Sequence, residues 1–419
     1  MNSSRVVKYI AIGTIALLLG ALSGWYFYLR DQSQTIADTA AGRGLGIGVP
    51  SFSGATGSTL RNIIYGISGS ETDNAAQERP VVAPPRLWHT HVTPIAGFGF
   101  MRTGTTTLIR FMERSTGNIF DADLETGEVT RITNTLIPAV HEAAFSKDGR
   151  VAARAEDAEG TVEAFTGIVS TTTASSTPDQ AALVRSLLGD GVLEVIPSYT
   201  GQSLLSLLED GAGSALVRSS IRGSEPERLF ASAIKGWDVT WLPDNRILLQ
   251  EKSASGVPSS AFELSPQGTL ISLARNVPGL TLLPRASSTA LLIGSDNGGL
   301  TLSIRSRDDA RLIPLPIQTI AKKCAWSPDP RLLAYCAAPL TAPAPFLDNW
   351  HRGLIRTADI IWRIDAATGT TERVVSLEEE SDTRIDVENP RIDPLGTYFA
   401  FQNAHDKSLW VLRLSDFGL

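Results

Sequence analysis

The stretches IFDADLETGEVTRI (residues 119–132) and IWRIDAATGTTERV (residues 361–374) share one layout, and this layout decides the fold. Each begins with an apolar, strand-like run, turns at Asp-x-x-Thr-Gly and continues as a second strand-like run. The Asp side chain can accept hydrogen bonds from turn amides, and Gly adopts the positive φ that closes such a hairpin. Two copies of one hairpin so far apart indicate a repeated β structure.

Three kinds of turn recur along the chain from about residue 86. One opens each unit, as in FSKDG (145–149); one ends the second strand, as in ERSTG (113–117); the third closes the outer hairpin. Three turns joining four strands, repeated every ~40 to 66 residues, are typical of a propeller blade. We predict an all-β fold, a seven-bladed β-propeller of four-stranded antiparallel blades, whose units begin near residues 93, 141, 193, 237, 279, 321 and 388.

The seventh unit is one strand short. The chain ends soon after TYFAFQN (397–403) and SLWVLRL (408–414), which would leave an open sheet edge. We therefore predict that RLWHTHV (86–92) supplies the outer strand and closes the ring.

His89 and His91 would then share one strand face. Such a pair can bind a metal ion, but no third ligand is near in sequence, so we expect neither a metal site nor a cofactor.

One repeat carries a family resemblance. WSPDPRLLAY (326–335) resembles the W-S-P-D-G-x-x-L-A-Y start of TolB-like and dipeptidyl-peptidase-type (WD40-like) propeller blades, with Pro330 where those families usually have Gly. The resemblance covers residues 86–419 in architecture, and the motif is degenerate in every copy. It implies the fold; it implies little about function, because propellers host unrelated activities.

The N-terminus has the pattern of a membrane anchor. YIAIGTIALLLGALSGWYFYL (9–29) carries no charge, and as a helix it would be roughly 31 Å long, about the thickness of the hydrocarbon core. Arg5 and Lys8 precede it, which favours a cytoplasmic N-terminus. The alternative is a signal peptide cleaved near Ser23. We predict a cytoplasmic N-terminus and single-pass anchor over 1–30, inserted in the lipid bilayer through 9–29.

The rest of the chain would then lie outside the cytoplasm. Residues 31–85 are rich in Gly, Ser and Thr and read as a flexible linker, followed by the propeller at 86–419. Two insertions interrupt the repeat. The first, 177–191, is predicted to be a short helix. The second, 338–359, is a Pro-rich loop carrying Trp350 and His351, which are candidates for a partner surface; alternatively, Trp350 covers the core.

The composition excludes some functions. A formal net charge of −7 and no cluster of basic residues argue against nucleic acid as a partner. No G-x-S-x-G motif is present, and the peptidase relatives of such propellers need a separate hydrolase domain. We expect a non-enzymatic binding or scaffold module for envelope proteins or surface polymers. The alternative is an extracytoplasmic hydrolase acting on glycan or peptide with carboxylates in the central channel.

Four acidic residues fall at one position of the repeat. Glutamates end the predicted second strand of four successive units and should therefore line one rim: Glu113, Glu156, Glu209 and Glu251. Such a rim could bind a cation or a basic partner. The plainer interpretation is that acidic residues and Gly make soluble hairpin turns.

The two cysteines of the chain lie close together, at 324 and 336. If SPDPR (327–331) connects two paired strands, Cys324 faces Cys336 on one side of the sheet. Directly opposed residues have the spacing that a disulfide needs, and the predicted compartment can be oxidising. We predict a cross-strand disulfide, with reduced packing as the alternative and a metal pair as a weaker one.

Overall fold

The computed structural model describes residues 83–170, 181–305 and 311–415. The predicted anchor, and the linker up to residue 82, lie outside these ranges. Within the described residues, no helix combines the length and the apolar character needed to span a bilayer.

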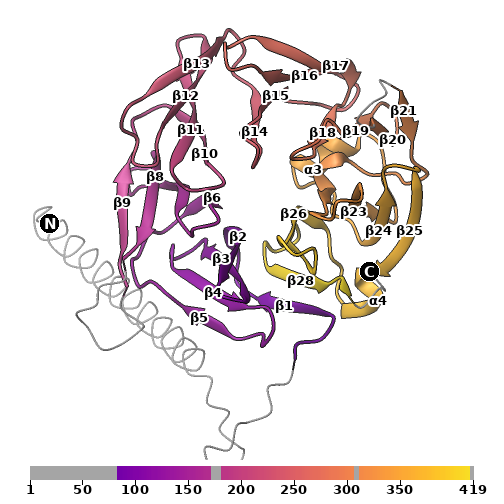
Figure 1. The fold of residues 1–419 in the computed structure, drawn as a ribbon, viewed down its shortest axis with the longest axis horizontal. Helices are drawn as coiled ribbons and strands as arrows, with labels where there is room; N and C mark the ends of the chain where they lie inside the picture. The colour runs from indigo at the N-terminus through magenta and orange to yellow at the C-terminus, as the bar shows by residue number, and fades with distance from the viewer. Residues whose placement is uncertain (1–82, 171–180, 306–310, 416–419) are drawn as a thin grey trace, which may run out of the picture. The chain divides into compact units, whose positions relative to one another are not determined.

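The described chain forms seven four-stranded antiparallel sheets arranged as blades around a central axis (Figure 1). In blades 1 to 6 the strands follow chain order from the axis outward. Blade 1 comprises β2 (Ile95–Thr103), β3 (Thr106–Glu113), β4 (Ile119–Asp123) and β5 (Val129–Arg131). Blade 2 comprises β6 (Val140–Phe145), β7 (Val151–Glu156), β8 (Val162–Val169) and β9 (Leu183–Leu187). Blade 3 comprises β10 (Val192–Pro197), β11 (Ser203–Asp210), β12 (Gly213–Ser220) and β13 (Glu227–Ser232).

The remaining blades follow the same plan. Blade 4 comprises β14 (Trp237–Trp241), β15 (Ile247–Glu251), β16 (Pro258–Leu264) and β17 (Leu270–Pro278). Blade 5 comprises β18 (Thr281–Pro284), β19 (Leu291–Asp296), β20 (Leu300–Arg305) and β21 (Leu312–Pro314). Blade 6 comprises β22 (Cys324–Trp326), β23 (Leu333–Pro339), β24 (Asp359–Asp365) and β25 (Thr370–Ser376). Three short helical segments accompany these strands: η3 (Ala321–Lys323), α3 (Phe346–His351) and α4 (Leu377–Ser381).

Blade 7 closes the ring as predicted. It comprises β26 (Val387–Ile392), β27 (Tyr398–Asn403), β28 (Leu409–Arg413) and, as its outer strand, β1 (Leu87–His91). The β1 strand pairs antiparallel with β28, with Leu87 opposite Leu412. The prediction that residues 86–92 complete the last blade is confirmed.

Buried apolar side chains fill the spaces between neighbouring blades. One cluster joins Tyr335 and Ile361 of blade 6 to Phe399 and Leu412 of blade 7, all of them at most 1% exposed. Alternate residues of each strand point to opposite faces, so every inner strand packs on two neighbours. The core is therefore a ring of interfaces between sheets.

The helix predicted over residues 177–191 is wrong where the structure describes it. Leu183–Leu187 forms β9, the outer strand of blade 2, and Leu183 lies opposite Val169 of β8. Without β9 the edge of β8 would keep its backbone groups unpaired, and pairing this edge outweighs the weak helical propensity of the segment.

The register of the first hairpin of blade 6 is also as predicted. Cys324 in β22 lies opposite Cys336 in β23, and the two sulfurs form a disulfide with an S–S distance of 2.06 Å. Both cysteines are at most 2% exposed. The bridge ties the innermost strand of blade 6 to the next strand, beside the central axis.

Replacing both cysteines by alanine should lower the free energy of unfolding by up to about 3 kcal/mol, because the unfolded chain gains the freedom that the short loop removed. Denaturant unfolding without reductant measures this loss. The matched comparison is wild-type protein unfolded with reductant, which should lose a similar amount. Equal midpoints for the variant and the oxidised wild type would contradict the prediction.

Candidate functional site

The four predicted glutamates lie where the sequence placed them, at or next to the ends of the second strands of blades 1 to 4. Antiparallel topology therefore puts them on one rim. Each carboxylate contacts its own set of neighbours, as follows: Glu113 with Thr93, Thr116 and His91; Glu156 with His141; Glu209 with Lys235; and Glu251 with the backbone N–H of Ser260. These sets do not overlap, so the four carboxylates share no partner.

One of the two predictions for the loop at 338–359 made Trp350 an exposed contact residue. The structure contradicts that prediction, because Trp350 is buried. It lies in α3, is 6% exposed, and donates its indole Nε1–H to both oxygens of Asp386 at 3.0 and 3.1 Å. A buried indole N–H needs an acceptor, and this carboxylate supplies it. The neighbouring His351 is exposed, so it alone of the pair remains available on the surface.

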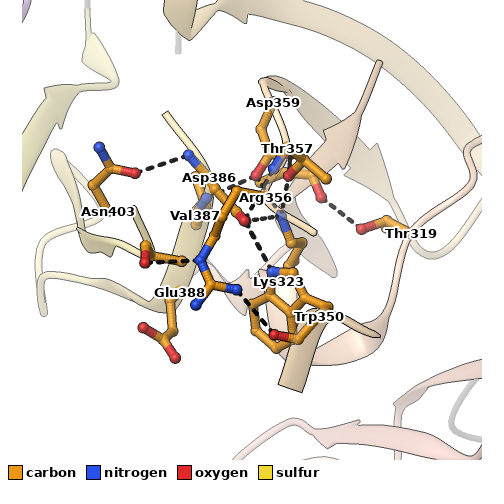
Figure 2. Close-up of polar contacts among 12 residues, drawn as sticks. Thr319, Lys323, Trp350, Arg356, Thr357, Asp359, Asp386, Val387, Glu388 and Asn403 are labelled. Carbon is orange, nitrogen blue, oxygen red and sulfur yellow. Dashed lines mark hydrogen bonds and ion pairs between the residues drawn. The ribbon is translucent and has the colours of Figure 1, made fainter. Parts of the chain in front are cut away.

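A fully buried lysine holds this region together (Figure 2). The Lys323 ammonium donates to Asp359 and Asp386, at 2.6 Å each, and to Thr357 Oγ1 at 2.9 Å. All three charged side chains are 0% exposed. The lysine also lies 5.5 Å from the Trp350 ring centre. This cluster joins η3, α3 and β24 of blade 6 to Asp386, which directly precedes β26 of blade 7.

The two aspartates of this cluster differ in proton affinity. Burial, reinforced by the charge of Asp386, raises the pKa of Asp359 against the opposing effect of Lys323. Burial also acts to raise the pKa of Asp386, but the Lys323 charge and hydrogen bonds from Trp350 and Thr357 bring it below its ordinary value. Asp359 is therefore the carboxylate that binds a proton first as the pH falls, which leaves one anion facing one cation.

The other side of α3 is anchored on blades 4 and 5. Asp296, at the end of β19, accepts hydrogen bonds from the Leu347 backbone N–H at 2.8 Å and from Ser255 Oγ at 2.6 Å. Asp348 accepts from the Ser255 backbone N–H at 3.0 Å. The loop predicted at 338–359 is thus docked on blades on both sides of it.

The histidines predicted to share a face contact different blades. A bulge lies between His89 and His91 in β1 and breaks the alternation. The His89 ring stacks on Trp410 of blade 7 at 4.4 Å, whereas the His91 ring packs against Phe111 of blade 1 at 4.7 Å. Within the ranges that the structure describes, no group of three or more potential metal ligands is found.

A cavity of about 730 Å³ runs along the central axis and is called the channel here. The first strands of the blades line it, together with Lys322 of η3. Its charged side chains come from five blades: Glu142, Glu194, Asp238, Lys322 and Arg391. The acidic residues belong to blades 2 to 4, and the basic residues are Lys322 of η3 and Arg391 of blade 7.

Two of the channel acids are paired and one is not. The Lys322 ammonium lies 2.5 Å from Asp238, and the Arg154 guanidinium lies 3.3 Å from Glu142. Glu194 accepts one long hydrogen bond, 3.4 Å, from the Val239 backbone N–H. No ion pair to Glu194 is found among the described residues.

Glu194 therefore holds its proton more tightly than an ordinary glutamate does. Burial, followed by the charges of Asp238 and Glu142, raises its pKa to about 8. At neutral pH it is mostly protonated and can donate a hydrogen bond into the channel. The sequence analysis did not single out Glu142, Glu194 or Asp238. A signal for them exists, since each falls at the second or third position of a first strand in successive units.

The raised pKa of Glu194 predicts a pH dependence of stability. The unfolded carboxyl ionises at its ordinary pKa, whereas the folded one keeps its proton up to about pH 8, so folding is favoured at low pH. Its contribution falls as the pH rises between these two values. The melting temperature of Glu194→Gln should therefore fall less than that of wild type between pH 5 and 9. Melting temperatures that fall equally between pH 5 and 9 in the two proteins would contradict this assignment.

Blades, ring closure and channel together define a seven-bladed β-propeller. No family model matches the sequence, and no curated protein matches it.

Several solved structures share the fold. An oligogalacturonate lyase from Vibrio parahaemolyticus is 10% identical at a TM-score of 0.52, over 79% of this chain and 94% of its own. YCF48 from Cyanidioschyzon merolae is 10% identical at 0.51, over 79% and 100%. Virginiamycin B lyase from Staphylococcus aureus is 13% identical at 0.50, over 78% and 99%. TolB from Acinetobacter baumannii matches at 0.40 and 10% identity, over 62% and 59%. Such identities show the fold alone.

Proposed function

We propose that this chain is a membrane-anchored, extracytoplasmic binding module. Residues 9–29 would cross the lipid bilayer with the N-terminus in the cytoplasm, and residues 31–85 would link this anchor to the propeller. The propeller would bind an envelope protein or a surface polymer without chemical change. The buried Cys324–Cys336 disulfide supports a compartment outside the cytoplasm, because disulfides persist where conditions are oxidising.

The channel is the observation that carries the proposal. It offers about 730 Å³, within the range of pockets that hold small ligands or the end of a polymer. Its acidic residues come from blades 2 to 4 and its basic residues from η3 and blade 7, and Asp238 and Lys322 form an ion pair within it. Glu194 and Arg391 have no ion-pair partner among the described residues, and such groups fixed in a narrow site favour ligands with complementary polar or charged groups.

Photo-crosslinking in intact cells tests this proposal. A photoreactive amino acid at Thr240, which is exposed in the channel, should give a discrete crosslinked product that mass spectrometry can identify. The control is the same amino acid at Val129 in the outer strand β5, 37% exposed. Equal products from both positions, or none from Thr240, would contradict binding through the channel.

Glu194 also favours a second candidate function, hydrolysis of a glycan or peptide. A protonated carboxyl near ionised carboxylates is the arrangement that general acid catalysis uses. Here Glu194 would act as the acid and Asp238 or Glu142 as the base. Two similar structures are named as lyases, but at 10 and 13% identity they support the fold only. Release of cleaved oligosaccharide or peptide by wild type, abolished in Glu194→Gln, would favour this candidate over simple binding.

A further inference from the structure

A second cavity of about 320 Å³ lies at the end of the channel where the first strands finish. Phe145 and Trp326 are the last residues of β6 and β22, and both line it. We call this cavity the aromatic mouth. Its main side chains come from several blades: Phe100, Phe145, Tyr199, Leu242, Leu283, Trp326 and Arg391, with four prolines.

The aromatic mouth contains two cations and no acidic side chain among its lining residues. Arg391 is an exposed residue, and its guanidinium lies 5.7 Å from the Phe98 ring centre; the Lys147 ammonium lies 5.2 Å from the Tyr199 ring centre. Among the described contacts neither cation has a carboxylate partner. A ligand with a negative charge would therefore complement this mouth.

The walls restrict what the rest of the ligand can be. Most lining side chains are aromatic, aliphatic or proline, and the Trp326 indole N–H is already bonded to the Leu283 carbonyl at 3.2 Å. A sugar would bury hydroxyl groups with few partners here, and each unpaired group is costly. An apolar body bearing one anionic group meets no such cost. An apolar peptide end with its free carboxylate has this composition.

Arg391 lines both the aromatic mouth and the channel. A carboxylate that enters from the mouth meets this guanidinium before it reaches Lys322, which precedes the start of β22, and Arg binds carboxylates through two parallel hydrogen bonds. Deeper in the channel, Lys322 is already paired with Asp238. Of the two channel cations, Arg391 is therefore the one without an ion-pair partner among the described residues, and an anionic end stops there.

We propose that the aromatic mouth binds the C-terminal end of a peptide, with the last apolar side chains against Phe100, Tyr199 and Trp326 and the α-carboxylate on Arg391. This inference rests on the proposed binding function and names its ligand class. The cavity has room for the last one or two residues, and the remainder of the partner stays outside.

Fluorescence anisotropy with the full-length chain in detergent tests the inference. The probe is a fluorescein-labelled Gly/Ser peptide ending in Val-Leu-Phe with a free carboxylate, compared with the same peptide ending in an amide. We expect the amide to bind at least tenfold more weakly, because it lacks the charge-assisted bonds. Arg391→Gln should remove this difference, and Lys147→Gln should weaken binding severalfold. Arg131→Gln on the outer strand β5 is the matched control and should change nothing.

Three outcomes would overturn the inference: no binding of the free acid, equal binding of acid and amide, or tighter binding of a galacturonate trimer than of the peptide. An unchanged melting temperature of Arg391→Gln shows that any loss is not misfolding. These outcomes are separable from failure of the proposed function. If Thr240 crosslinks a partner while the peptide fails, only the ligand class is wrong.

Discussion

Replacing Lys323 by methionine should lower the free energy of unfolding by about 3 to 5 kcal/mol at neutral pH. The substitution leaves Asp359 and Asp386 buried beside each other with no cation, and neither carboxylate can reach solvent. Denaturant unfolding of wild type and Lys323→Met measures the loss. The deficit should shrink as the pH is lowered, because protonation removes the unpaired charges and the folded variant binds those protons more tightly than its unfolded chain.

Lys322→Met is a matched control one residue away. Lys322 is half-buried and pairs with Asp238, which keeps solvent contact, so its loss should cost less than about 1 kcal/mol. Similar losses for the two variants, or a Lys323→Met deficit that grows at low pH, would contradict the role assigned to the buried cluster. The comparison also bears on function, because η3 carries both lysines and the cluster fixes the turn that presents Lys322 to the channel.

Gly97→Ala should cost upwards of about 3 kcal/mol, beyond the ~1–3 kcal/mol typical of overpacked cores. A Cβ atom at residue 97 would lie 1.8 Å from the carbonyl oxygen of Ala143 in β6, so one of the two inner strands must move. At this point the backbone of β2 in blade 1 lies directly against the backbone of β6 in blade 2. Thermal and denaturant unfolding would report the loss.

Gly299→Ala is the control for this prediction. Gly299 precedes β20 and has an ordinary φ, and an added Cβ would meet nothing within 4 Å. Its replacement should change the free energy of unfolding by no more than about 0.5 kcal/mol. If Gly97→Ala were equally harmless, the close approach of β2 and β6 would be wrong.

Most of the fold could be predicted because turn chemistry repeats. Gly and Asp at hairpin turns are required by backbone geometry, so the seven unit boundaries followed from local sequence. The predicted start near residue 321 lies within a few residues of β22, and the pairing of Cys324 with Cys336 followed from counting across one turn. Even the closing strand was predictable, since a missing fourth strand requires a donor.

What failed depends on contacts between distant segments. Leu183–Leu187 has helix-compatible residues, and only the open edge of β8 makes it a strand. Trp350 is buried because Asp386, far along the chain, accepts its indole hydrogen bond. The channel acids were missed because they come together only when the first strands of successive blades lie side by side. A single blade carries no sign of which of its charges will lack a partner.

The closing strand also sets an order of events during synthesis. β1 leaves the ribosome before any other strand of the propeller, yet its partner β28 is the last to be made. Until then Leu87, 5% exposed in the finished ring, lacks the side chains of blades 6 and 7 that it packs against, whereas Trp88 also belongs to a cluster with blade 1. A nascent chain thus carries an unpaired, apolar strand through almost the entire translation of the domain, which invites pairing with other chains. The ring therefore closes only after β28 has been made, and until that moment β1 must stay free of other partners.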